Sequence, residues 1–159
     1  MTDITADRRT TARELAMQAL CQLDIQGQDV FQWLGRFFRD ECSDAMTVEL
    51  AEQWTRGAWD QVNLCDEQIK QAAAKWKLSR MSQVDRNILR LAVYQIGFCP
   101  DIPGKVILNE AIEMARKYST EQSPRFVNGV LDAVLRLVRP SGSPAAAVDS
   151  DEKQEGPCP

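Results

Sequence analysis

The spacing of apolar residues constrains this chain more than any other feature, because it follows the period of an α-helix almost throughout. No stretch shows the strict alternation or the β-branched runs that are typical of strands. The sequence therefore predicts an all-α fold of about seven helices. The predicted helices cover residues 9–25, 30–38, 48–62, 69–76, 82–99, 106–118 and 123–138.

Residues with known terminal preferences mark several of these boundaries. Asp7, Ser82 and Ser123 can cap helix starts, and Pro124 fits the first turn, where its missing N–H costs nothing. Gly27 is expected to end the first helix.

The length of 159 residues suits one compact domain or two small subdomains that share a core. We expect a flexible N-terminus over residues 1–7, a helical domain over 8–139 and a disordered acidic tail over 140–159, which has too few apolar residues to repay ordering. No apolar run is long enough to span a bilayer, and the polar N-terminus lacks a signal-peptide core. A cytoplasmic protein without membrane contact is expected.

Composition argues against an enzyme. The chain has no histidine, which removes the commonest general base and the commonest transition-metal ligand. Its five cysteines are scattered and never spaced as C-x-x-C, so we expect reduced, mostly buried thiols and neither a disulfide framework nor a zinc site. We predict no catalytic residue, no cofactor and no metal.

The formal charge of −4 hides a strong asymmetry along the chain. Residues 14–74 carry 4 basic and 11 acidic side chains, whereas residues 75–140 carry 11 basic and 6 acidic ones. The last eleven residues hold four acidic side chains and Lys153. Such a protein can still present a cationic face to phosphate.

Two segments are candidates for that face. Arg8, Arg9 and Arg13 surround the start of the first helix, where they either converge on a phosphate or form an ordinary solvated helix end. Arg125 and Phe126 begin the last helix and could stack and hold a splayed RNA base, although Phe126 also fits a core position.

Two further features have open alternatives. Gly129, after Asn128, costs a helix about 1 kcal/mol relative to alanine. Close packing of a neighbouring helix is the favoured compensation, and the approach of a ligand is the other. Arg86 and Arg90, beside Asp85, share one helical face and form either a phosphate site or surface ion pairs.

Three stretches together resemble the NusB family of transcription antitermination factors. They are RRTTARELAMQAL at 8–20, QVDRNILRLAVY at 83–94, and the segment 102–132, which contains NEAIEMA and FVNGVLD. In this order and at these separations they cover most of residues 8–138.

The resemblance implies two small helical bundles that share a core. It also implies pairing with the ribosomal protein NusE and binding of boxA RNA in nascent ribosomal RNA transcripts. With RNA polymerase and other Nus factors, such a complex promotes read-through of terminators. The family's RNA-contacting positions fall on Arg9, Arg13, Asp85, Arg86, Gln122, Arg125, Phe126 and Asn128.

The chain departs from the family pattern at several positions. Thr10 and Thr11 interrupt the basic run and Cys21 replaces a frequent tyrosine, which should weaken the RNA face. Gln122 stands where an acidic residue is frequent, which should strengthen RNA binding.

Two other functions remain as alternatives. Some ribosomal RNA cytosine methyltransferases open with a NusB-like domain, but they need a glycine-rich nucleotide-binding domain and a catalytic cysteine, for which this chain has no room. A helical scaffold or homodimer that binds protein and no RNA is the third possibility.

Overall fold

The computed structural model describes residues 4–74 and 81–140, which form seven α-helices and one short 3-10 helix. No strand occurs within these two ranges, so the predicted all-α class is confirmed. The elements are α1 (Ile4–Gln26), η1 (Gln28–Val30), α2 (Phe31–Glu41), α3 (Ala45–Asp60), α4 (Val62–Ala72), α5 (Gln83–Phe98), α6 (Gly104–Tyr118) and α7 (Ser123–Val138).

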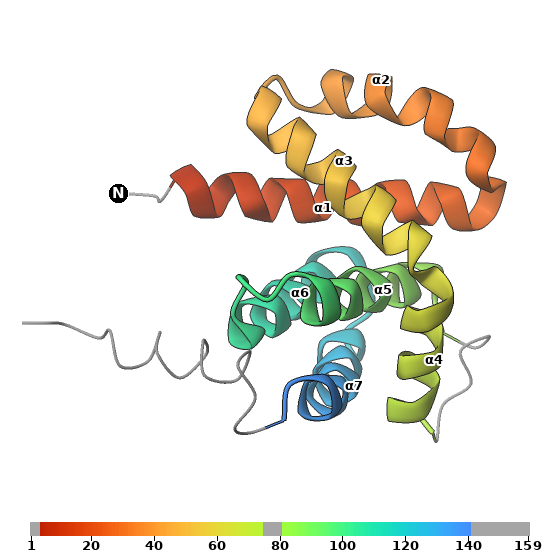
Figure 1. Cartoon of the computed structure of the whole chain (residues 1–159), viewed down its shortest axis with the longest axis vertical. Coiled ribbons are helices and arrows are strands. Elements are labelled where there is room, and N and C mark those ends of the chain that lie inside the picture. The colour runs from red at the N-terminus through yellow and green to blue at the C-terminus, as the bar shows by residue number, and fades with distance from the viewer. Residues whose placement is uncertain (1–3, 75–80, 141–159) are drawn as a thin grey trace, which may run out of the picture.

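The helices form two small bundles that share one core, as predicted. Helices α1 to α3 make one bundle and α4 to α7 the other, and α1 and α3 both pack on α5 (Figure 1). Helix α5 is therefore surrounded, and every residue from Asn87 to Val93 is buried. None of the helices in the described ranges has the length and apolar character needed to cross a bilayer.

Predicted helix boundaries are wrong at two places. Helix α1 begins at Ile4, so residues 4–7 are helical and Asp7 lies in the first turn, where its charge suits the helix dipole. The helices expected over 48–62 and 69–76 are α3 and α4, but the backbone turns between them at Gln61, so α4 already begins at Val62. The expected extension to Trp76 and nearly all of the expected tail lie outside the described residues.

Other local predictions are confirmed. The Ser82 hydroxyl accepts a hydrogen bond from the Asp85 N–H at 3.1 Å and caps α5. Gly27 ends α1 with a φ of 82°, a conformation that favours glycine. The prediction of mostly buried thiols is wrong, however: of the four cysteines in the described ranges, all free thiols, Cys65 is buried and Cys21, Cys42 and Cys99 are half-buried. Burial raises the pKa of Cys65 to about 12.

Arg139, just after α7, fixes the C-terminal end of the fold. Its guanidinium is buried and donates hydrogen bonds to the backbone carbonyls of Ile96 at 3.1 Å, Ile102 at 2.9 Å and Cys99 at 3.0 Å. A cation at this position satisfies carbonyls that the end of α5 leaves unpaired. The side chain thereby ties α7 to α5 and to the loop before α6.

Gly57 in α3 should be intolerant of a side chain. A Cβ there would collide with the Tyr94 ring, which is stacked on Phe98 with ring centroids 5.5 Å apart. We expect Gly57→Ala to lower the free energy of unfolding by about 1–3 kcal/mol, despite alanine's higher helix propensity. Urea denaturation measures this, with Gly97→Ala as the control because a Cβ at Gly97 meets open space. Equal stability of the two variants would contradict the packing argument.

Candidate nucleic-acid interface

The N-terminal arginines do not form one cationic cluster. Arg8 is ion-paired with Asp44, the cap of α3, with Nε 3.0 Å from a carboxylate oxygen. Arg9 is half-buried, and no hydrogen bond or ion pair joins it to another described residue. Of the three, Arg9 is thus the one whose charge has no carboxylate partner within the described ranges.

Arg13 does not fit the phosphate-binding role predicted for it, because its side chain is only 2% exposed. The guanidinium lies 5.0 Å from the centre of the Trp54 ring, its Nε donates to Gln95 at 3.3 Å, and Nη1 is 3.6 Å from a Glu110 oxygen. Burial lowers the pKa of Arg13, and the nearby Glu110 carboxylate opposes that shift. Arg13 lies among the buried residues of α1. Its side chain therefore enters the interior, where it contacts residues of α3, α5 and α6.

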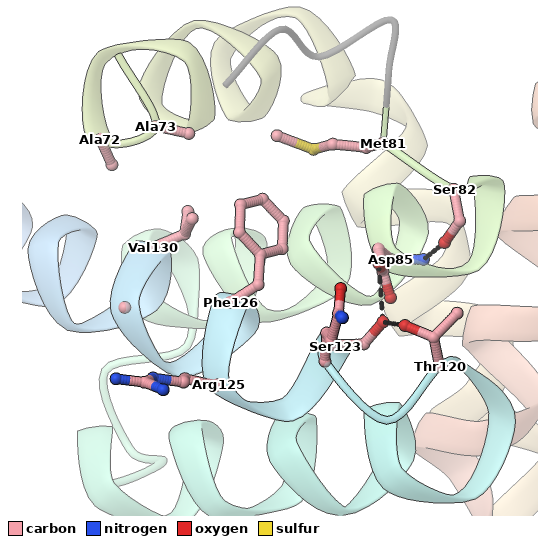
Figure 2. A pocket seen from close by; sticks show the side chains of 12 residues that line it. Ala72, Ala73, Met81, Ser82, Asp85, Thr120, Ser123, Arg125, Phe126 and Val130 are labelled. Carbon is pink, nitrogen blue, oxygen red and sulfur yellow. Dashed lines mark hydrogen bonds between the residues drawn. The ribbon is translucent and has the colours of Figure 1, made fainter. Parts of the chain in front are cut away.

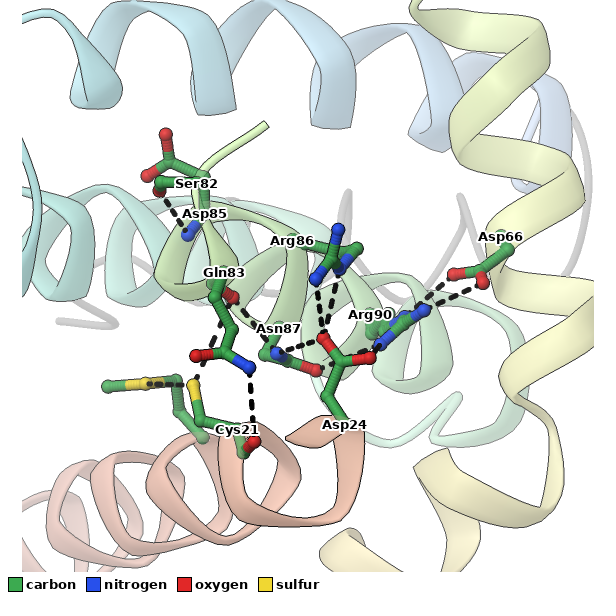
Figure 3. A network of polar contacts seen from close by, with 10 residues as sticks. Cys21, Asp24, Asp66, Ser82, Gln83, Asp85, Arg86, Asn87 and Arg90 are labelled. Atoms are coloured by element: carbon green, nitrogen blue, oxygen red, sulfur yellow. Dashed lines mark hydrogen bonds and ion pairs between the residues drawn. The ribbon is translucent and has the colours of Figure 1, made fainter. Parts of the chain in front are cut away.

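Arg86 and Arg90 belong to a polar network between the two bundles (Figure 3). Arg86 donates to one Asp24 oxygen from Nε at 3.0 Å and from Nη2 at 2.8 Å, and Asn87 donates to the same oxygen at 3.2 Å. Arg90 contacts the other Asp24 oxygen at 3.1 Å and pairs with Asp66 of α4 at 2.7 and 2.8 Å. The two arginines and two aspartates balance in charge, so this face forms ion pairs, but they lie largely buried between helices and not on the surface, where the second alternative placed them.

A pocket of about 570 Å³ lies where α7 begins (Figure 2). The Phe126 ring is half-buried and points into the space between α7, the end of α4 and Met81, while Arg125 points away from the ring. Phe126 is therefore not enclosed by the core. The pocket is lined by Ala72, Ala73, Met81, Ser82, Asp85, Thr120, Gln122, Ser123, Arg125, Phe126, Gly129 and Val130.

Asp85 is one of the residues that line this pocket. Asp85 is 8% exposed, and its carboxylate accepts hydrogen bonds from Ser119 at 2.6 Å and from Ser123 at 2.9 Å. The two bonds fix the turn between α6 and α7 to α5, and Figure 2 shows the one from Ser123. Asp85 is thus largely engaged inside the protein. Ser123 is the first residue of α7 and not its cap, because its hydroxyl is committed to Asp85.

The surroundings of Gly129 decide between the two explanations that the sequence left open for a glycine inside this helix. Gly129 is exposed, and a Cβ built on it would meet nothing within 4 Å, so close helix packing, the favoured explanation, is wrong. Its bare backbone instead borders the Phe126 pocket. Arg125 and Asn128 also line a second cavity, of about 590 Å³, which residues of α6, the α6–α7 turn and α7 enclose.

Five of the predicted RNA-contacting residues therefore meet at one place. Neither of these two cavities is lined by the N-terminal arginines or by Arg86. The residues around them are Asp85, Gln122, Arg125, Phe126 and Asn128.

The sequence model of the NusB family matches residues 10–136. This chain belongs to the NusB family. A transcription antitermination protein NusB from Anaeromyxobacter dehalogenans is 44% identical over 135 residues, which cover 84% of this chain and 94% of that protein. The structure of T. maritima NusB is 38% identical, has a TM-score of 0.72, and covers 81% of this chain and 89% of that one.

A second solved structure shares the NusB-family fold. It is a crystal structure of antitermination factors NusB and NusE in complex with double-stranded RNA, with a TM-score of 0.72. Its NusB-like chain is 24% identical, and the match covers 82% of this chain and 98% of that one.

Sequence reasoning missed the carboxylates that hold the predicted cations. Asp24 follows Leu23 near the end of α1, and Asp44 caps α3. One sequence feature could have indicated that Asp24 is paired. This residue lies beside the apolar face of its helix, and a charge there needs a partner when that face is buried. Its partner lies 62 residues away, which no local pattern reports.

Asp24 should contribute stability that depends on pH. Burial alone would raise the pKa of Asp24, but hydrogen bonds from Arg86 and Arg90 outweigh burial and hold the pKa below its ordinary value of 3.8. The network therefore stabilises the fold above that value, and the stabilisation is lost as pH falls through the lowered pKa. We expect Asp24→Asn to lower the free energy of unfolding at neutral pH by about 2–3 kcal/mol.

Urea denaturation between pH 2 and pH 7 tests this expectation. The difference between Asp24→Asn and the parent protein should shrink toward the acid end, as pH falls through the lowered pKa of the parent carboxyl. Asp40→Asn, at an exposed pair with Arg36 on α2, is the control and should change stability little. A difference that stays constant with pH would refute the linkage.

Proposed function

We propose that this NusB-family chain is an RNA-binding transcription antitermination factor that pairs with NusE on boxA RNA of nascent ribosomal RNA transcripts. With the RNA polymerase elongation complex and other Nus factors, it promotes read-through of terminators. It acts by binding, not as an enzyme, in the cytoplasm.

The observation that carries the proposal is the Phe126 pocket. An aromatic ring that is partly exposed in a pocket offers a surface on which a base can stack. Beside it, Arg125 is exposed and forms no ion pair with any described residue, so it can meet a phosphate. Gln122 adds a neutral hydrogen-bonding group, and the open backbone at Gly129 permits close approach.

Family membership and the related complex support the same function. The matched relatives are named transcription antitermination proteins, and a structure of the same fold contains NusE and RNA. The rival proposal, a scaffold or homodimer without RNA, predicts no RNA affinity.

Fluorescence anisotropy of labelled boxA RNA, with this protein alone and with NusE, tests the proposal. We expect tighter binding of boxA than of a scrambled RNA when NusE is present, with a salt slope of several phosphate contacts. Arg125→Glu should reduce RNA binding and leave NusE binding intact. Equal, weak binding of both RNAs under all conditions would leave the scaffold as the better explanation.

Phe126 should contribute stacking that an aliphatic side chain cannot replace. We expect Phe126→Leu to weaken boxA binding by about tenfold, since stacking is worth roughly 1–3 kcal/mol per base. The fold should survive, because leucine keeps the apolar contact. Phe98→Leu is the matched control, since Phe98 is 44% exposed and lies outside the pocket. If both variants bind like the parent protein, no base stacks on Phe126.

A further inference from the structure

The second cavity carries an arginine that sequence reasoning did not assign to RNA. Arg116, near the end of α6, lines this cavity together with Arg125 and Asn128 of α7 and with one acidic residue, Glu121 of the α6–α7 turn. Thr120 and Arg125 also line the Phe126 pocket, so the two cavities adjoin. Two arginines from two different helices thus border one hollow next to the stacking surface.

The charge of Arg116 is held only weakly within the protein. Its side chain is 61% exposed and pairs with Glu113, which is 65% exposed and three residues earlier on the same helix. Exposed pairs of this kind contribute about 0–1 kcal/mol, so an incoming phosphate can displace the Glu113 carboxylate. Arg13 and Arg86 differ in this respect, because buried or half-buried partners hold them.

Lys117 extends the same cationic segment toward the other bundle. Its Nζ is 3.0 Å from a carboxylate oxygen of Glu14 on α1, and the Lys117 side chain is 60% exposed. The end of α6 therefore has one cation facing α7 and the next facing α1. Favourable interaction with the C-terminal dipole of α6 explains why cations are stable there, but not why Arg116 borders a cavity with Arg125.

We propose that Arg116 is an RNA-binding residue that holds a phosphodiester group of the RNA strand in this second cavity, opposite Arg125. The inference rests on the proposed function and adds a phosphate subsite to it. A base on Phe126 and a phosphate between the two arginines would engage one strand across both cavities. Ion pairing with phosphate needs no covalent step and no cofactor.

Two charge-neutralising substitutions at the exposed pair test the proposal by the sign of their effects. Arg116→Gln should weaken binding of labelled boxA RNA, measured with NusE present, by about fivefold at 0.1 M salt, and reduce the salt slope by about 0.7. Glu113→Gln should strengthen binding by about two- to threefold, because it removes the competing carboxylate. A merely structural ion pair would give both variants the same sign.

The matched controls are Arg36→Gln and Asp40→Asn, which change an equally exposed arginine–carboxylate pair on α2. Neither should alter RNA affinity by more than the general effect of net charge. If the parent protein binds boxA and Arg116→Gln binds equally well, the phosphate subsite is refuted while the proposed function stands.

Two other outcomes also decide the matter. If the parent protein binds no RNA with or without NusE, the proposed function fails, and the subsite with it. If Arg116→Gln weakens NusE binding and leaves RNA binding unchanged, the residue belongs to a protein interface, and the proposal is overturned.

Discussion

The structure depends on α5, a helix that is surrounded by others and still carries polar and charged groups. Burial of an unpaired charge costs far more than a hydrogen bond returns, so the charged side chains of α5 need partners on neighbouring elements. Arg90 meets Asp24 of α1 and Asp66 of α4, and Asp85 meets the α6–α7 turn. Electrostatic pairing thereby fixes how the two bundles sit on the shared helix, beyond what apolar packing specifies.

This pairing also decides which cations can serve RNA. Arg8 and Arg86 lie against carboxylates, and Arg13 is enclosed by the core. Arg9 of α1 has no carboxylate partner among the described residues, and the accessible charge near the two cavities lies on Arg116 at the end of α6 and Arg125 at the start of α7. A binding surface in this protein is thus defined less by where basic residues occur than by which of them lack a strong internal partner.

The sequence was sufficient for the fold class and for most helices, because a period of 3.6 residues is a local property. It failed where geometry is set by distant contacts. The break at Gln61 has neither proline nor glycine at its centre, and the burial of Arg13 depends on Trp54 and Glu110 from other helices. The stretch from Gln122 to Asn128 was readable as a site because its residues are consecutive on one helix end, whereas Arg116 joins it only through the packing of α6 on α7.

Arg139 has a consequence for how the protein is made. Its guanidinium closes the end of α5 and the following loop, which lie some forty residues earlier in the chain. During translation, the residues that carry those carbonyls are synthesised before Arg139, which donates hydrogen bonds to them. The second bundle therefore cannot reach its final packing until α7 and Arg139 have emerged from the ribosome, so its folding depends on a residue made well after the helix that it closes.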